Sequence, residues 1–150
     1  MDGISAFAFF CEDVRREASG KETLIGVMAD IMQFAAYPAQ VRRLQVYFRI
    51  RFAVGKKYNQ IIMPMLELDG KEVEASSPNE PFPLDMIERS LASAGKRKLP
   101  YITAAGRVRV TEPFPVQGPG QMRAILNVAG ERMLCGVLTL TERATPSNET

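Results

Sequence analysis

The chain has 150 residues, of which 46% are hydrophobic and 24% charged, and its formal net charge is +2. This length suits one domain with a sizeable core, so neither a metal nor a disulfide is needed to hold the fold. Because the net charge is small, a site for polyanions would have to come from local clustering of basic side chains. The sequence contains no histidine, which excludes Ser-His-Asp and Cys-His nucleophiles and removes the commonest transition-metal ligand.

The two cysteines, Cys11 and Cys135, stand far apart in the sequence. The first residues show no basic leader followed by a long apolar run, and no apolar stretch approaches ~20 residues. We therefore expect a cytoplasmic protein with free thiols and no membrane association. Two cysteines cannot complete a zinc site, so we expect neither a metal nor another cofactor.

Alternating apolar and polar residues, which are typical of β-strands, dominate the chain. The first predicted strand covers residues 5–16 and places Phe7, Phe9 and Cys11 on one side. We interpret that side as the buried one. A second strand is predicted over residues 22–34.

A turn at residues 18–21 is predicted to join these two strands. The Gly20-Lys21 pair suggests a phosphate-binding loop, but that loop needs a glycine where Arg15 stands. Asp30 falls within the apolar second strand, where a buried acid would need partners. Its role stays open.

Residues 43–54 give the clearest alternation in the chain. One face carries Leu44, Val46, Phe48, Ile50, Phe52 and Val54, and the other carries Arg43, Gln45, Tyr47, Arg49, Arg51 and Ala53. A strand that is apolar on one face only favours an antiparallel sheet.

The middle of the chain combines a hairpin and a helix. Asp69-Gly70 supplies the positive φ angles of a tight hairpin turn, and Pro64 before it indicates an edge or a bulge. Apolar residues recur at helical spacing over residues 84–94, and Gly95 follows as the expected C-terminal cap.

The last third of the chain returns to strands. They are predicted at residues 101–104, 107–114, 122–128 and 131–142. The final two form a hairpin around Ala129-Gly130.

These patterns predict one mainly β domain over residues 1–142 and a disordered polar tail over residues 143–150. Many short strands with turns between them and a single inserted helix favour an antiparallel β-sandwich. A small closed β-barrel is the alternative.

Several predicted strands are apolar on both faces, as residues 131–140 are. A two-layer sandwich leaves its outer faces in water, so the inserted helix or another subunit must cover this surface. We therefore expect a non-enzymatic binding or assembly module that forms a homo-oligomer or docks on a protein partner.

An arginine-rich sheet face is the alternative binding site. Tyr47, Arg49 and Arg51 share one side of their strand, and Arg107 and Arg109 share one side of theirs. If these strands are neighbours, the face can bind a nucleotide, another anionic small molecule or single-stranded nucleic acid through phosphate pairing and base stacking.

The other interpretation of this face is a solvated surface whose arginines pair with glutamates on adjacent strands. Those glutamates are Glu67, Glu112, Glu131 and Glu142.

The charged stretch that begins at Cys11 also allows two interpretations. A nucleophilic Cys11 would need neighbouring charges that lower its thiol pKa, whereas its place after two phenylalanines indicates a buried, inert thiol. We favour the inert thiol and expect no catalytic residue. Asp13 and Arg15 share one face, so we expect an ion pair near the end of the sheet, with a ligand-facing pair as the alternative.

Three short motifs resemble an uncharacterised family. The strand FAFFCEDVRRE, the Gly20-Lys21 pair and the following LIGV are similar to the opening of small bacterial and phage proteins that form a domain of unknown function. The closing segment PFPVQGPGQMRAILNVAGE resembles the final strands of immunoglobulin-like sandwiches. The resemblance implies an immunoglobulin-like sandwich, from which the inserted helix departs, and it supplies no catalytic residues.

Overall fold

The computed structural model describes residues 2–76 and 80–144. The strands are β1 (Ile4–Cys11), β2 (Asp13–Arg16), β3 (Glu22–Ile25), β4 (Ile31–Phe34), β5 (Ala39–Val41), β6 (Gln45–Ala53), β7 (Ile62–Leu68), β8 (Lys71–Glu72), β9 (Tyr101–Arg109), β10 (Phe114–Val116), β11 (Gly120–Val128) and β12 (Glu131–Glu142), and the helix is α1 (Leu84–Lys96). Residues 145–150 of the expected disordered tail lie outside the described residues.

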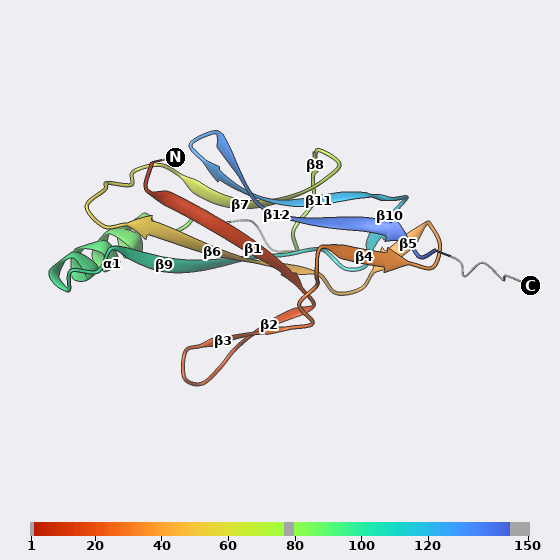
Figure 1. Ribbon diagram of the computed structural model, residues 1–150, viewed down its shortest axis with the longest axis horizontal. Helices are drawn as coiled ribbons and strands as arrows, with labels where there is room; N and C mark the ends of the chain where they lie inside the picture. The colour runs from red at the N-terminus through yellow and green to blue at the C-terminus, as the bar shows by residue number, and fades with distance from the viewer. Residues whose placement is uncertain (1, 77–79, 145–150) are drawn as a thin grey trace, which may run out of the picture.

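Two layers of strands form the body of the protein (Figure 1). One layer is the three-stranded sheet β1-β6-β9, and the other is the five-stranded sheet β4-β12-β11-β7-β8. The two-stranded sheets β2-β3 and β5-β10 complete the set of sheets in the described residues. The prediction of a mainly β, sandwich-like fold with one short helix is confirmed.

Two details of the predicted fold need correction. Among the described pairings, β4 and the end of β12 run parallel, whereas the others are antiparallel. No sheet in the described residues closes on itself, because β1, β9, β4 and β8 remain edge strands. The alternative of a small closed barrel is therefore wrong.

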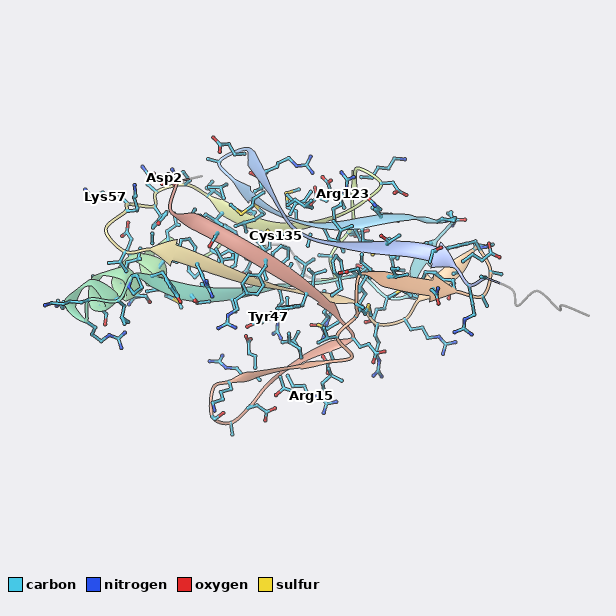
Figure 2. The ribbon with its side chains drawn as sticks, viewed as in Figure 1. Asp2, Arg15, Tyr47, Lys57, Arg123 and Cys135 are labelled. Carbon is cyan, nitrogen blue, oxygen red and sulfur yellow. The ribbon has the colours of Figure 1, made fainter. Side chains whose placement is uncertain are left out.

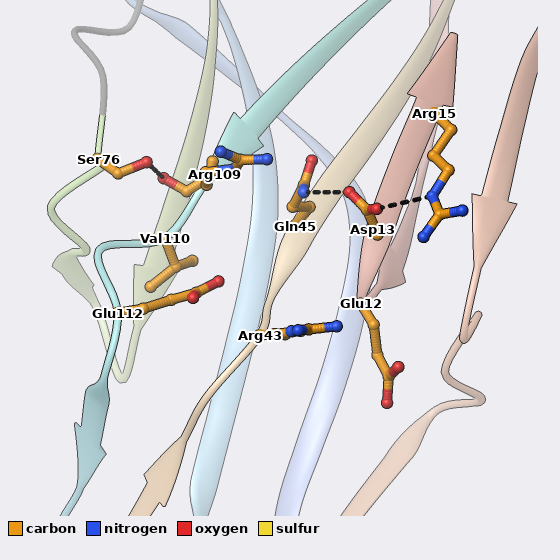
Figure 3. Close-up of a pocket in the computed structure, with 9 residues that line it drawn as sticks. All are labelled: Glu12, Asp13, Arg15, Arg43, Gln45, Ser76, Arg109, Val110 and Glu112. Atoms are coloured by element: carbon orange, nitrogen blue, oxygen red, sulfur yellow. Dashed lines mark hydrogen bonds and ion pairs between the residues drawn. The ribbon is translucent and has the colours of Figure 1, made fainter. Parts of the chain in front are cut away.

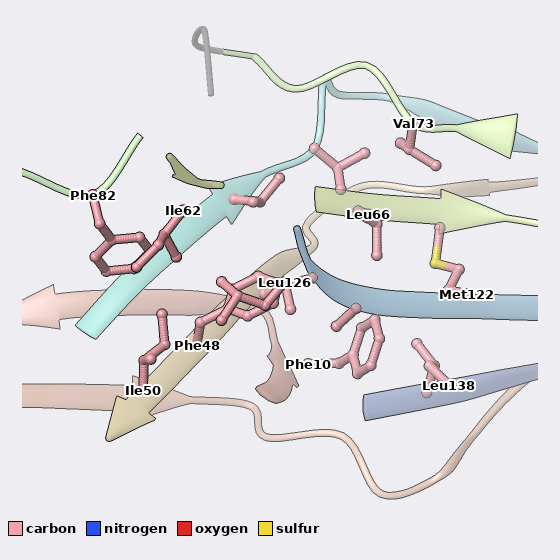
Figure 4. Packing of buried hydrophobic residues seen from close by; sticks show 14 of the residues in the cluster. Phe10, Phe48, Ile50, Ile62, Leu66, Val73, Phe82, Met122, Leu126 and Leu138 are labelled. Atoms are coloured by element: carbon pink, nitrogen blue, oxygen red, sulfur yellow. The ribbon is translucent and has the colours of Figure 1, made fainter. Parts of the chain in front are cut away.

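The apolar face of β6 forms the centre of the core (Figure 4). Phe48 and Ile50 are fully buried there, as are Leu66 of β7 and Leu126 of β11. Burying a side chain of this size contributes roughly 1.5–3 kcal/mol. The alternation predicted for residues 43–54 is confirmed over residues 46–52, whereas Gln45, predicted on the outward face, is buried.

The helix predicted over residues 84–94 is confirmed and extends to Lys96. Its buried residues are Ile87, Leu91 and Ala94. Gly95 lies inside the helix rather than at its end, so the predicted cap is wrong. The left-handed residue after the helix is Lys98, with a φ of 56°.

Strands β2 and β3 form a hairpin that projects from the sandwich, and we call residues 13–25 the arm (Figure 1). The predicted strand 5–16 is interrupted at Glu12. The predicted strand 22–34 is interrupted after Ile25, because Gly26 adopts a φ of 61° that takes the chain out of the strand.

The chain enters and leaves the arm at one place. The backbone N–H of Glu12 donates to the carbonyl of Ile25 at 3.0 Å. At the far end of the arm, Gly20 has a φ of 79°, which confirms the predicted turn.

The two predicted tight hairpins are also confirmed. Asp69-Gly70 and Ala129-Gly130 have positive φ angles at both positions, as a type I′ turn requires. Pro64 lies opposite Leu126 of β11, and β8 reaches only the end of β7, so no described strand pairs with the other edge of β7 at Pro64.

The inward side of β1 differs from the prediction. Phe7 and Phe9 point outward with exposures of 36% and 39%, whereas the alternate positions Ala6 and Ala8 pack against the core. Small residues are needed inside because β1 and β12 approach closely there. A Cβ atom on Gly136 would lie 2.9 Å from the carbonyl oxygen of Ala8.

Asp30 is exposed in a bend before β4 rather than buried in a strand, so the predicted apolar setting is wrong. The predicted strands 101–104 and 107–114 are also redrawn. The first and the beginning of the second form the continuous strand β9, and Phe114 begins β10.

Candidate functional site

The outward side of the β1-β6-β9 sheet carries aromatic and arginine side chains together. We define the arginine–aromatic face as Phe7, Phe9, Tyr47, Arg49, Arg51, Tyr101 and Arg107. All of these are exposed except Tyr47, which is half-buried. β6 lies between β1 and β9, so the sheet brings the two predicted arginine strands together.

The strand register places unlike side chains in rows across this face. Phe9 lies opposite Tyr47, which lies opposite Arg107, and Phe7 lies opposite Arg49. The rings of Phe7 and Phe9 meet edge to face at 5.5 Å. The Arg51 guanidinium stands 4.8 Å from the centre of the Tyr101 ring, within cation–π range.

The arginines of this face have no acidic partner in the described part of the chain. Strands β1, β6 and β9 contain neither aspartate nor glutamate. No salt bridge joins Arg49, Arg51 or Arg107 to another described residue. Of the glutamates expected to pair with them, Glu67 is instead bonded to Arg132 on the other sheet.

The arm borders the face on one side. Figure 2 shows Tyr47 between the sheet and the arm, and Arg123 on the opposite side of the sandwich. The Tyr47 hydroxyl donates to Glu22 Oε2 of β3 at 2.7 Å. Burial and this carboxylate raise the pKa of Tyr47 to about 12, so the hydroxyl stays protonated and keeps donating.

A pocket of about 590 Å³ lies at the end of this face, where the arm leaves the sandwich (Figure 3). We call it the charged pocket. Its ionisable side chains are Glu12, Asp13, Arg15, Arg43, Arg109 and Glu112. Gln45, Ser76 and Val110 complete the lining. The pocket therefore balances three guanidinium groups against three carboxylates.

Asp13 organises the arm side of the pocket. Its Oδ2 lies 3.3 Å from Arg15 Nε, and its Oδ1 accepts from Gln45 Nε2 at 3.0 Å and from the Val14 N–H at 2.9 Å. The bond from Arg15 is the main reason that the pKa of Asp13 is lowered. The structure thus contains the Asp13–Arg15 pair, and it places both residues at a pocket.

The predicted site residues divide between two places. Tyr47, Arg49, Arg51 and Arg107 share the arginine–aromatic face, whereas Arg109 lines the charged pocket with Asp13 and Arg15. Sequence reasoning missed Glu12, Arg43, Gln45 and Glu112 as pocket residues. They lie up to a hundred positions apart in the chain, and no local pattern signals that the beginning of β6 and the loop after β9 meet the arm.

Cys11 is fully buried beside the charged pocket, and its thiol donates to the Gln45 carbonyl oxygen at 3.7 Å. Burial, with the nearby Asp13 charge, raises the pKa of Cys11 to about 11. Burial also raises the pKa of Cys135 to about 11. At neutral pH both thiols therefore stay protonated, whereas an activated cysteine nucleophile has a lowered pKa and is a thiolate.

The described residues contain neither a candidate metal site nor a helix that could span a membrane. No group of three or more acidic or cysteine side chains there has the arrangement of a metal site. In the same residues, no helix is long and apolar enough to cross a membrane.

Comparison with known proteins places the chain in a family. A family model described as a family of unknown function, DUF6941, matches residues 6–139. The chain belongs to this family. The family match confirms the expected uncharacterised family and covers both sheets, the arm and the helix. No curated protein matches the chain, and no solved structure does.

Proposed function

We propose that this member of the family is a non-enzymatic binding protein whose arginine–aromatic face binds single-stranded nucleic acid. The observation that carries the proposal is the combination on one sheet face of three unpaired arginines with four aromatic rings, on strands that contain no acidic residue.

This combination matches the chemistry of a flexible polyanion with exposed bases. Arginine binds phosphate through parallel hydrogen bonds, and exposed rings offer surfaces on which successive bases stack. Phe7 lies directly opposite Arg49, and Phe9 lies in the next row opposite Tyr47, so a base and its phosphate can be held at the same time. A duplex hides the faces of its bases, so the single-stranded form is favoured.

The direct test is fluorescence anisotropy with a labelled oligothymidylate of about 12 nucleotides. We expect the wild-type chain to bind and the double variant R49Q/R51Q to bind at least tenfold more weakly. Loss of two phosphate contacts should also reduce the slope of log affinity against log salt by about 1.4, as measured between about 50 and 200 mM salt.

The matched control is Arg123→Gln, which removes an exposed arginine from the opposite sheet. It should leave affinity unchanged. The variant Phe9→Ser should weaken binding without changing the salt slope, because it removes stacking and no charge. Equal losses for Arg123→Gln and R49Q/R51Q, or no binding by the wild-type chain at low salt, would overturn the proposal.

A second candidate function, self-association, is favoured by a separate observation. Leu134, Ile125 and Met65 form an apolar row across the outward side of β12, β11 and β7. Leu134 is 57% exposed, Met65 is half-buried and Ile125 is buried, so the exposed part of the row is centred on Leu134. The helix packs beside β9 and does not cover this row (Figure 1), so a second copy or a protein partner is the proposed cover.

The strand order also supports the finer proposal of an immunoglobulin-like sandwich. That fold has strands A, B and E in one sheet and strands C, F and G in the other. The orders β1-β6-β9 and β7-β11-β12 correspond to these sets. In this assignment, the arm follows strand A, and the helix stands between C and E.

A further inference from the structure

The charged pocket contains a buried hydrogen-bond acceptor without a partner. Gln45 is 3% exposed, and its Oε1 has no hydrogen-bond partner among the described residues. Burying a carbonyl oxygen without a donor is costly, so this atom indicates a missing hydrogen-bond donor.

The orientation of this amide is fixed. Gln45 Nε2 donates to Asp13 Oδ1 at 3.0 Å, and Figure 3 shows Oε1 on the opposite side of the amide, away from Asp13. Turning the amide over would place its oxygen against the carboxylate, so the unpartnered atom has to be the oxygen. The Cys11 thiol donates to the backbone carbonyl oxygen of Gln45, which holds the main chain in place as well.

The charges around this acceptor are balanced and separated. Arg43 and Arg109 make no salt bridge with a described residue, and neither do Glu12 and Glu112. A ligand with only negative charge would meet the carboxylates, and one with only positive charge would meet the guanidiniums. A small molecule that carries both charges satisfies both sets.

A second pocket of about 520 Å³ adjoins the first, since Glu12 and Arg43 line both. Met28, Met32, Phe34 and Val41 give this pocket apolar walls, and Gln40 and Arg42 add polar groups to Glu12 and Arg43. An apolar substituent that passes between Glu12 and Arg43 would be buried there.

We propose that the charged pocket binds an amino-acid zwitterion with an apolar side chain. The ligand carboxylate is held by Arg43 and Arg109. Its ammonium group donates to Gln45 Oε1 and to Glu112, and its side chain packs on Met28, Met32 and Phe34 in the adjoining pocket. This site is separate from the arginine–aromatic face and does not rest on the proposed function.

The test is isothermal titration calorimetry with L-leucine as the probe. We expect N-acetyl-L-leucine, which lacks the ammonium charge, and L-leucinamide, which lacks the carboxylate, each to bind at least tenfold more weakly. Glycine should also bind more weakly than L-leucine, because it has no side chain to pack on Met28, Met32 and Phe34 in the adjoining pocket.

Two exposed residues give variants that should leave the fold intact. Arg43→Gln and Glu112→Gln should each weaken L-leucine binding at least tenfold, whereas the control Arg49→Gln on the arginine–aromatic face should not change it. The absence of measurable heat with L-leucine at millimolar concentration would overturn the proposal. Equal affinity for L-leucine and its N-acetyl or amide form would do the same, whatever the result with oligonucleotides.

Discussion

At the scale of single residues, Asp13 links the arm to the sandwich. Its carboxylate accepts from Arg15 and Val14 within the arm and from the buried amide of Gln45 in β6. Each of these bonds favours the charged form, which is why the pKa of Asp13 lies below its ordinary value of 3.8.

Asp13 therefore makes stability depend on pH in the acid range. The unfolded chain binds the proton more readily than the folded chain, so the stabilisation is present above pH 3.8 and is lost as the pH falls toward the lowered pKa. We expect Asp13→Asn to be less stable than wild type at neutral pH and to show a shallower loss of stability on acidification.

The measurement is the urea midpoint at a series of pH values from about 7 to about 3. Asp30→Asn is the control, because Asp30 is exposed and its side chain makes no hydrogen bond or salt bridge with a described residue, so the change should not alter how stability depends on pH. An unchanged slope for Asp13→Asn would show that Asp13 does not anchor the arm in solution.

The alternation of residues predicted which side of β6 is buried, but it did not predict which side of β1 is buried. The strand around Phe48 has arginines on one side and large apolar residues on the other, so its inward face is unambiguous. In β1 both faces are apolar, and the choice depends on a neighbour that the local sequence does not contain. Gly136 of β12 leaves room only for small residues, so Phe7 and Phe9 turn outward.

At the scale of elements, the close approach of β1 and β12 defines how the two sheets meet. A Cβ atom on Gly136 would lie 2.9 Å from the Ala8 carbonyl oxygen, which is backbone and cannot move aside alone. We expect Gly136→Ala to destabilise the protein by about 1–3 kcal/mol, since the strands would have to separate.

Gly118→Ala is the matched control, because no atom lies within 4 Å of the added Cβ. Urea unfolding of both variants gives the comparison, with m-values checked for two-state behaviour. Equal stability of Gly136→Ala and wild type would mean that the two strands stand further apart in solution.

The ends of strands were predictable where a local residue determines the backbone conformation. They were not predictable where contacts with distant strands determine where a strand ends. Asp69-Gly70 and Ala129-Gly130 set their turns by themselves. The ends of β3 and β4 depend on different partners, because among the described strands β3 pairs with β2 alone and β4 pairs with β12 alone. The alternation over residues 22–34 therefore continues across residues 26–30, where the chain leaves the sheet β2-β3 and enters the five-stranded sheet.

At the scale of the whole molecule, the apolar row on the five-stranded sheet should control self-association. We expect light scattering at high micromolar concentration to give a mass above that of the monomer for wild type. Leu134→Glu should give the monomer mass, because it places a charge at the exposed end of the row.

Met86→Glu provides the control, since Met86 is also 57% exposed but lies on the helix. Far-ultraviolet circular dichroism checks that both variants fold. A monomeric wild-type chain, or dissociation by Met86→Glu alone, would count against the row as an interface.

The sequence predicted the fold class and the arginines of one sheet face, since both follow from alternation along single strands. It did not predict the charged pocket. Gln45 appears in the sequence as one polar position on a half-buried strand, and only the position of the arm explains why its amide is buried.

The single entry and exit point of the arm makes this part of the chain a modular insertion. The backbone N–H of Glu12, just before the arm, donates to the carbonyl of Ile25 at its end. The two ends of the arm therefore meet, and the sandwich strands on either side can connect without residues 13–25. Within such a framework, the part of the arm beyond the buried Val14 can change in length and composition while the core stays the same. Variation there would alter the pocket through Arg15, which pairs with Asp13, and the neighbouring face through Glu22, and it would leave the packing between the sheets untouched.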